Sequence, residues 1–306
     1  MSEVLKIKEV SKTLGNRKVV DNISLEVHQN EIVGFLGANG AGKTTTIKMV
    51  LGLLSIDSGE IYIHGHGVKH EFEKALENVG GIVESPDMYG YMSGLDNLKL
   101  SANARGVNKN RIQEVISLVG LDNRIKDKVG KYSLGMKQRI GLAQSMLHRP
   151  SILVLDEPTN GLDPVGIKEL RGIIKKLAHE QETSVLVSSH ILSEMQLMCD
   201  RVCIIDRGKI LITRSVAELE ELSGHSGYRF IAKPIDVAIK IIKEKLSGKL
   251  IASTEKTVDV NISESEINNL TQAMISEGVS VLGVSPIEKS LEEIYMKITG
   301  GDNKIG

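Results

Sequence analysis

A glycine-rich stretch, GANGAGKT at residues 37–44, has the residue types and spacing of a phosphate-binding loop. It matches the pattern G-x-x-x-x-G-K-[ST] and stands between an apolar run and an expected helix from about Lys43 to Leu54. The backbone N–H groups of such a loop point inward at a helix N-terminus and would cradle a triphosphate. Lys43 would bind the β- and γ-phosphates, and the hydroxyl of Thr44 would bind Mg²⁺. The predicted nucleotide-binding residues of this stretch are Gly37, Ala38, Asn39, Gly40, Ala41, Gly42, Lys43, Thr44 and Thr45.

Two acidic residues end another apolar run, ILVLDEP. Asp156 and Glu157 would lie at the carboxyl end of a buried strand, where an open parallel sheet places its ligands. We expect Asp156 to assist Mg²⁺ and Glu157 to be the general base for the water that attacks the γ-phosphate. His190 ends a third apolar run, SVLVSSH, and would stand at the same edge near the γ-phosphate. A single histidine after a strand is more often structural, but its neighbours here favour catalysis, so Glu157, His190 and Lys43 are the predicted catalytic residues.

These three stretches need a parallel sheet that brings their ends together. Beyond about residue 150 the chain alternates apolar runs with helical stretches, which favours a mostly parallel sheet covered by helices. The first thirty residues alternate apolar and polar positions around a GN turn and predict an antiparallel β layer. Residues 85–150 are helix-rich, with apolar side chains at the 3.6-residue spacing of one helix face. We therefore expect an α/β P-loop NTPase core in residues 1–222, with an N-terminal antiparallel β layer and a helical insertion at about 85–150.

A second domain is expected beyond SGHSG, where small and polar residues interrupt the pattern. The segments that follow favour the order strand, helix, strand, strand, helix, strand and a last helix, SLEEIYMKIT. That order predicts a small C-terminal α+β domain of ferredoxin-like type at residues 226–306.

The charge balance excludes some classes of protein. Lys and Arg number 38 against 39 Asp and Glu, so the chain has no bulk positive field that would draw it onto nucleic acid. The longest apolar runs, such as residues 32–36 and 152–155, are far shorter than the ~20 residues that cross a bilayer. The start, MSEVLKIKEV, carries charges where a signal peptide needs an uninterrupted apolar segment. We expect a cytoplasmic chain that does not bind nucleic acid.

Two further groups of side chains have metal-binding residue types. Cys199 and Cys203 offer two ligands, fewer than a four-coordinate zinc site needs, so we expect reduced, buried thiols. His64, His66 and His70 in HGHGVKH are interrupted by glycines directly after a strand-like run, which favours a turn over a metal site.

The order of the motifs GANGAGKT, YSLGMKQR, ILVLDEP, NGLDP and SSH resembles that of the ATP-binding subunits of ABC transporters. The resemblance covers roughly residues 1–222. SLGMKQR is similar to the LSGGQ signature of that family, with Leu134 and Met136 departing from it. The resemblance implies hydrolysis of ATP with Mg²⁺ at sites shared by two subunits, in which Ser133 and Gly135 of one subunit face the γ-phosphate on the other.

Three more positions take their roles from this resemblance. Asp163 in NGLDP resembles the D-loop residue that crosses the subunit interface, although the family more often has Ser-Ala-Leu-Asp. Leu14 occupies the place of the usual aromatic that stacks on adenine. Glu84 in GGIVESP occupies the place of the Q-loop glutamine, which links Mg²⁺ and water to the transporter domains. The implied Mg²⁺ ligands are therefore Thr44, Asp156 and Glu84.

Glu84, together with NGLDPVGIKELR, SSHILSEM and a C-terminal extension of this size, resembles the bacitracin-resistance and lantibiotic-immunity type of subunit. This implies export of antimicrobial peptides, separately encoded membrane permease subunits, a homodimer of ATP-binding subunits, and a peripheral position on the inner face of the cell membrane. In the family a short helix of the membrane subunit enters a groove beside the loop after Glu84. Tyr89 and Tyr91 would then contact the partner, unless they pack inside the helical insertion.

Two alternatives remain open. A soluble ABC ATPase acting on DNA or ribosomes is disfavoured, because each motif occurs once and no sustained heptad run appears. A transporter subunit with another cargo, such as a lipid, a polysaccharide or a small drug, fits the same motifs, because the membrane partners choose the cargo.

Overall fold

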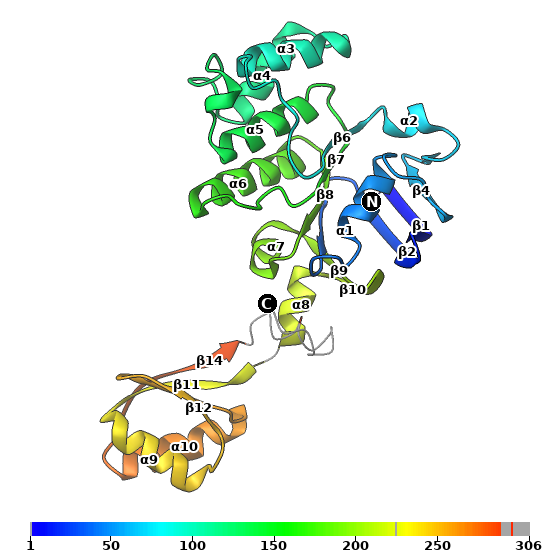
Figure 1. The fold of residues 1–306 in the computed structure, drawn as a ribbon. Coiled ribbons are helices and arrows are strands. Elements are labelled where there is room, and N and C mark those ends of the chain that lie inside the picture. Colours follow the sequence, from blue (N-terminus) through cyan, green and yellow to red (C-terminus); the bar gives the residue numbers. More distant parts are fainter. Residues whose placement is uncertain (1, 224, 289–294, 296–306) are drawn as a thin grey trace. The chain divides into compact units, whose positions relative to one another are not determined.

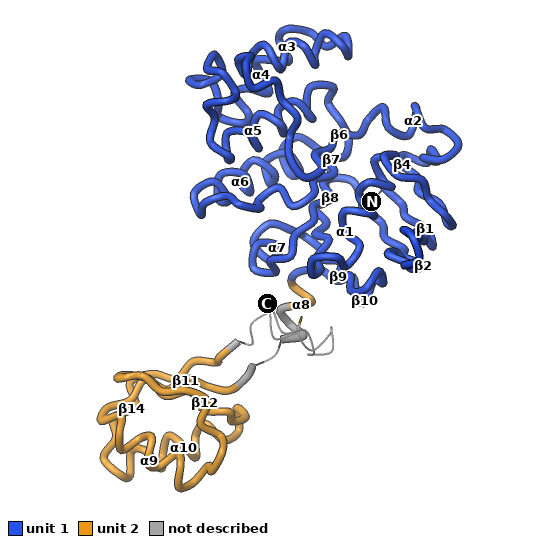
Figure 2. Tube along the Cα trace, in the orientation of Figure 1, with its two compact units in different colours: residues 1–216 blue, residues 217–306 orange. Residues whose placement is uncertain are grey.

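The central sheet of the protein is built from short apolar strands that are buried on both faces. The computed structural model describes residues 2–223, 225–288 and 295. The chain divides into two compact units, residues 1–216 and 217–306 (Figure 2). The strand order of the central sheet is β10-β9-β3-β8-β7-β6, in which only β10 runs antiparallel to its neighbour. Its strands are β3 (Ile32–Leu36), β6 (Val79–Ile82), β7 (Ile152–Leu155), β8 (Ser184–Ser189), β9 (Arg201–Asp206) and β10 (Lys209–Ser215).

Helices join and cover these strands, as expected for an α/β core. The helix that follows β3 ends earlier than the sequence pattern indicated, at Val50 instead of Leu54. Among the described residues, no helix is both long and apolar enough to cross a membrane. The helices of this part are α1 (Lys43–Val50), α6 (Pro164–Glu180) and α7 (Leu192–Met198), whereas α8 (Val216–Ser223) begins at the last residue of the first unit and continues into the second.

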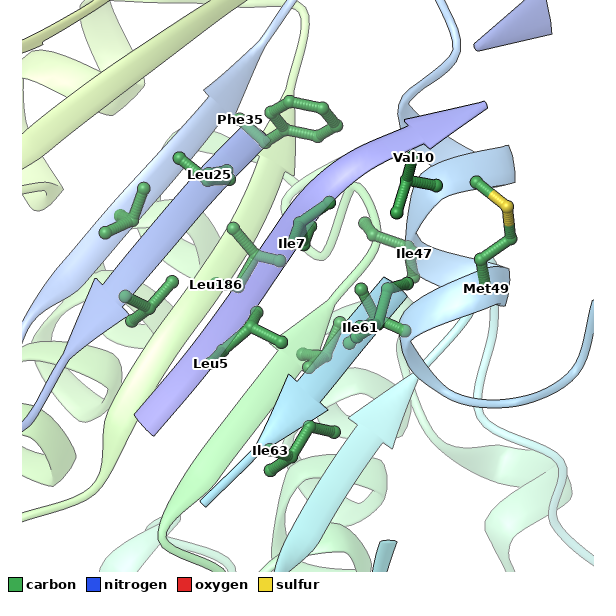
Figure 3. Packing of buried hydrophobic residues seen from close by; sticks show 14 of the residues in the cluster. Leu5, Ile7, Val10, Leu25, Phe35, Ile47, Met49, Ile61, Ile63 and Leu186 are labelled. Carbon is green, nitrogen blue, oxygen red and sulfur yellow. The ribbon is translucent and has the colours of Figure 1, made fainter. Parts of the chain in front are cut away.

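The expected antiparallel layer is present and forms a second sheet with the order β2-β1-β4-β5. Its alternating apolar side chains, among them Leu5, Ile7 and Leu25, are buried and belong to one cluster with Phe35 of the central sheet and Ile47 of α1 (Figure 3). This layer therefore holds the start of α1 in a fixed place by burying apolar surface on it. The elements are β1 (Glu3–Leu14), β2 (Arg17–His28), β4 (Ser58–Ile63), β5 (His66–Gly67) and α2 (Phe72–Leu76).

The helical insertion is present between β6 and β7, and in Figure 1 its helices lie together, apart from β1, β2 and β4. Each of its α-helices begins with a side-chain cap, from Ser93, Asn108 and Ser133. Such caps satisfy backbone N–H groups that a helix leaves free at its start. The helices are α3 (Gly94–Ala104), α4 (Lys109–Leu118), the short 3₁₀ turn η1 (Val129–Lys131) and α5 (Leu134–Ser145).

The second unit contains the predicted ferredoxin-like module. Its four-stranded antiparallel sheet has the order β12-β13-β11-β14, which is the interleaved order of a split βαβ pair. Phe230 and Val258 of the sheet share a buried cluster with Ile242 and Met274 of the two helices. The predicted last helix, SLEEIYMKIT, lies outside the described residues except for Tyr295. The elements are β11 (His225–Lys233), α9 (Ile235–Lys245), β12 (Leu250–Ser253), β13 (Thr257–Val260), α10 (Glu264–Ser276) and β14 (Ser280–Glu288).

Candidate functional site

The glycine-rich loop joins the end of β3 to the start of α1, the place that the sequence predicted for it. Gly40 and Gly42 have φ angles of 79° and 111°, which glycine adopts without a steric penalty. A Cβ atom on Gly42 would lie only 2.7 Å from the carbonyl oxygen of Val19, so the loop also needs a glycine there for space. This backbone has the form of an anion-binding loop at a helix N-terminus.

Lys43 lies buried inside this loop. Its Nζ donates hydrogen bonds to the carbonyl oxygens of Gly37 at 2.6 Å and Ala38 at 3.2 Å, and lies 3.1 Å from Oε1 of Glu157. The ammonium group is therefore held where the loop would place phosphate, with one carboxylate beside it as counter-charge.

The acidic pair follows β7. Asp156 is buried, and its Oδ1 accepts a hydrogen bond from the Ser188 hydroxyl of β8 at 2.6 Å. Glu157 has a φ of 48°, in the left-handed region that non-glycine residues rarely adopt. Its backbone N–H donates to the Ser188 hydroxyl at 2.9 Å, which helps to hold this strained turn.

His190 stands directly after β8, between the ends of the loop strand and the acidic strand. Its Nδ1 lies 2.6 Å from Oε2 of Glu157, and because a carboxylate only accepts, Nδ1–H is the donor. The other nitrogen, Nε2, is then the acceptor in the neutral ring. Because β3, β8 and β7 are neighbours in the sheet, Lys43, Glu157 and His190 meet at one edge. The carboxylate thus has one positive partner and one hydrogen-bond donor, an arrangement that can orient a base.

A cavity of about 710 Å³ opens onto this edge and collects most of the predicted site. The predicted residues that line it are Asn39, Gly40, Gly42, Lys43, Thr44, Thr45, Glu84, Asp156, Glu157 and His190. Gly37, Ala38 and Ala41 belong to the same loop but do not line the cavity.

Glu84, which follows β6, also lines the cavity. Its φ is 62°, its side chain is exposed, and its Oε1 lies 3.0 Å from Nζ of Lys48 on α1. Together with Thr44 and Asp156 it offers the hydroxyl and carboxylate oxygens that Mg²⁺ prefers. Within the described part of the chain, no three His, Cys, Asp or Glu side chains gather as a metal site. The three oxygen donors of Thr44, Asp156 and Glu84 would therefore suit a cation that is also held by phosphate oxygens of a bound substrate.

Three residues that the resemblance placed in the site lie outside this cavity. Ser133 caps α5, where its Oγ accepts a hydrogen bond from the N–H of Met136 at 3.3 Å. Gly135 lies in the first turn of the same helix. Asp163 caps α6, where its Oδ1 accepts from the N–H of Gly166 at 2.8 Å.

Leu14 also lies outside the cavity. It is 45% exposed at the end of β1. Arg17, its cross-strand partner at the start of β2, lines the cavity together with Val19. Sequence reasoning missed both residues, although their place in the same short hairpin as Leu14 was a signal.

Gln138 is a further residue that sequence reasoning missed. It lines the cavity from α5, is 3% exposed, and its Oε1 has no hydrogen-bond partner within the described structure. An unpaired buried acceptor is costly, and a ligand or water in the cavity would satisfy it. The sequence signal for Gln138 was its position within SLGMKQR, the stretch that resembles the LSGGQ signature. The other lining residues that were missed are Ser85, Leu134 and Asn160.

The cysteines and one of the histidines with metal-binding residue types have ordinary structural places. Cys199 and Cys203 are free and buried, and burial raises the pKa of both thiols, that of Cys203 to about 12. The prediction of buried thiols is therefore confirmed. His64 lies in the turn between β4 and β5, which is consistent with the turn that was favoured there.

The loop that follows Glu84 exposes two tyrosines. Tyr89 and Tyr91 are 51% and 72% exposed, and their rings contact each other edge to face with centroids 5.8 Å apart. The alternative that they pack inside the helical insertion is thus wrong for this structure. A second cavity, of about 590 Å³, lies beside the loop and is lined by Pro86 and Asp87 among others.

Comparison with known proteins identifies the family and the fold. The family model described as "ABC transporter" matches residues 20–160. The bacitracin transport ATP-binding protein BcrA of Bacillus licheniformis is 39% identical over 303 residues, covering 98% of this chain and 99% of that protein. The lantibiotic transport ATP-binding protein SrtF of Streptococcus pyogenes is 39% identical over 219 residues, covering 72% and 94%. A solved structure of an ATP-binding subunit of an ABC transporter, 27% identical, superposes with a TM-score of 0.64 and covers 72% of this chain and 93% of that one.

Proposed function

Because the chain belongs to the family of ABC transporter ATP-binding proteins, we propose that it is the ATP-hydrolysing subunit of a bacterial exporter of antimicrobial peptides that confers resistance or self-immunity. The observation that carries the catalytic part is the contact of Glu157 with both Lys43 and His190 at the edge of the sheet.

In this proposal the loop at residues 37–44 and Lys43 bind the phosphates of ATP. Glu157 removes a proton from a water molecule, whose oxygen forms a bond to the γ-phosphorus while the bond to the bridging oxygen of ADP breaks. His190 keeps the Glu157 carboxylate oriented and stands beside the γ-phosphate. Bound Mg²⁺, held by Thr44, Asp156 and Glu84, would neutralise charge on the phosphate oxygens.

Two copies of the chain would complete each site. Ser133, Gly135 and Asp163 lie at helix starts outside their own nucleotide cavity, and a second copy would receive them against its own bound ATP. Helix N-termini suit this task because their free N–H groups bind anions. We infer a homodimer, since each chain then supplies one half of two equal sites.

The membrane part of the exporter would come from separately encoded permease subunits, and the chain would work on the inner face of the cell membrane. Tyr89 and Tyr91 would contact these partners, because exposed aromatic side chains are enriched at interfaces. Binding to nucleic acid is not part of the proposal.

The most specific part of the proposal is the class of cargo, an antimicrobial peptide. BcrA supports it, because it matches this chain over nearly its whole length and is named for bacitracin transport. A lipid, polysaccharide or drug as cargo is the alternative. Loss of the gene would separate them: an antimicrobial-peptide exporter predicts a lower inhibitory concentration of bacitracin or a lantibiotic, with unchanged sensitivity to unrelated drugs.

The catalytic proposal is tested by Glu157→Gln. We expect ATP hydrolysis to fall by ~10² to 10⁴, the usual contribution of a positioned general base, while ATP still binds. The unhydrolysed ATP should also convert the isolated protein from monomer to dimer, which sedimentation would measure. Glu182→Gln, an exposed glutamate with the same left-handed φ after α6, is the matched control and should behave like the parental protein. Hydrolysis at the parental rate in Glu157→Gln would show that another group is the base.

A further inference from the structure

The loop that carries the exposed tyrosines, residues 86–93, is held from beneath by one buried side chain. Asn97 on α3 is 4% exposed. Its Oδ1 accepts a hydrogen bond from the N–H of Tyr89 at 2.9 Å, and its Nδ2 donates to the carbonyl oxygens of Tyr89 at 3.1 Å and Ser93 at 3.0 Å. Because buried polar groups are costly to leave unpaired, the loop and this amide specify each other's position.

The same loop is bonded to a second segment, residues 127–132. The N–H of Gly130 donates to the carbonyl oxygen of Gly90 at 2.8 Å, and the N–H of Val129 donates to that of Met92 at 3.0 Å. The two glycines cross closely: a Cβ atom on Gly130 would lie 3.0 Å from the carbonyl oxygen of Gly90. A side chain at this crossing would push the two segments apart.

The second segment leads directly into the signature serine. Tyr132 is 5% exposed, and its hydroxyl donates to the carbonyl oxygen of Arg124 at 2.8 Å. Gly94, the first residue of α3 after the loop, packs against that hydroxyl so closely that a Cβ atom on it would lie 2.4 Å away. Tyr132 is followed directly by Ser133, which caps α5. The tyrosine loop and the approach to Ser133 are thus packed and hydrogen-bonded as one unit.

We propose that Asn97 is a positioning residue for Ser133: by clamping residues 86–93 onto residues 127–132, it fixes where the signature serine is presented to the nucleotide of a second copy. This inference rests on the proposed two-chain ATP site and adds a residue that touches neither nucleotide nor Ser133. Since Tyr89 and Tyr91 stand on the clamped loop, the exposed surface and the signature share one support.

The test uses Glu157→Gln, which should dimerise with ATP, as the background. Adding Asn97→Ala should raise the ATP concentration needed for half-maximal dimerisation about tenfold, as expected when a hydrogen-bonded support is lost. The affinity of the monomer for a fluorescent ADP analogue should stay at the background value, because the phosphate loop lies on other elements. Asn103→Ala, an exposed asparagine on the same helix, is the matched control and should change neither value.

A second variant guards against a simple folding defect. Gly130→Ala adds one Cβ at the crossing with Gly90 and should shift dimerisation in the same direction by a smaller factor, whereas Gly172→Ala, which meets open space on α6, should not. In hydrogen exchange, Asn97→Ala should speed the amides of Tyr89, Val129 and Gly130 together.

The outcomes separate the inference from the function on which it rests. If the Glu157→Gln background stays monomeric with ATP, the two-chain site fails, while the exchange experiment still decides the clamp. The second outcome is that the Glu157→Gln background dimerises with ATP. If the ATP concentration for half-maximal dimerisation is then the same after adding Asn97→Ala or Gly130→Ala, the positioning role is overturned. Faster exchange at Tyr89 with parental exchange at Val129 and Gly130 overturns the clamp itself.

Discussion

At the scale of single residues, the hairpin of Leu14 and Arg17 differs most from what the resemblance implied. Arg17 and Val19 line the cavity, whereas the half-exposed Leu14 on the same hairpin does not. A guanidinium group can stack on the face of an aromatic ring, which makes Arg17 suitable for holding adenine. We propose that Arg17 stacks on adenine in place of the aromatic that is missing at Leu14.

Two substitutions in this hairpin test that assignment. Arg17→Ala should weaken nucleotide binding by roughly 1 kcal/mol, about fivefold in Kd, because a cation–π contact contributes on that scale. Leu14→Tyr should tighten binding by roughly 1 kcal/mol if the added ring also reaches the base. Titration with a fluorescent ATP analogue measures both, with Arg171→Ala on α6 as the control. Unchanged affinity in Arg17→Ala would mean that adenine is held by other groups.

At the scale of elements, α10 of the C-terminal unit begins with a dense polar cap. Oε2 of Glu266 accepts hydrogen bonds from the N–H and the hydroxyl of Ser263, both at 2.9 Å, and Oε1 lies 2.6 Å from Nζ of Lys249. The hydrogen bond with Lys249, followed by those with Ser263, lowers the pKa of Glu266 from 4.5 to about 2. The charged carboxylate therefore stabilises the folded state.

This cap makes the stability of the C-terminal unit depend on pH. Because the pKa of Glu266 is lower in the folded state, its stabilisation is complete above pH 4.5 and is lost as the pH falls towards about 2. Glu266→Gln should lower the melting temperature of that unit at pH 7, and the difference from the parental protein should shrink as the pH falls from 5 to 2. Calorimetry of the full chain measures the unfolding transition of the C-terminal unit beside that of the first unit. Glu264→Gln, in the same helical turn, is the control, and an equal loss there would assign the effect to the helix dipole instead of the cap.

At the scale of the whole molecule, the loop at residues 86–93 is the proposed contact surface for another protein. Exposed aromatic side chains cost little stability to remove, whereas buried ones leave cavities. Tyr89 and Tyr91 are exposed, and Tyr132, which directly precedes the N-cap residue Ser133 of α5, is buried. The three tyrosines therefore offer a clean contrast between an interface and a core.

The double substitution Tyr89→Ala with Tyr91→Ala should leave the melting temperature and ATP binding of the isolated chain nearly unchanged and abolish co-purification with the membrane partner. Tyr132→Ala should instead lower the melting temperature by several degrees, since it empties a packed site. Thermal melts and affinity purification from membranes measure these outcomes. Normal recovery of the partner with the double variant would place the contact surface elsewhere.

Local sequence pattern was enough to predict the fold class, the place of the glycine-rich loop between β3 and α1, the place of Asp156 and Glu157 directly after β7, and the ferredoxin-like module. Each of these depends on residues that are close together in the chain: glycines that permit a tight loop, an apolar run that ends in carboxylates, and a fixed order of strands and helices. The strands β3, β7 and β8 could also be expected to end at one edge, because parallel strands share their direction.

The contacts that make these residues a site were decided by the tertiary structure. The carboxylate of Glu157 between Lys43 and His190, and the amide of Asn97 beneath the tyrosine loop, join segments that are far apart in the chain. The same holds for Arg17 taking the place at the cavity that was expected of Leu14. Such contacts depend on strand register, helix placement and side-chain packing, and these arise only when distant elements bury their apolar faces against each other.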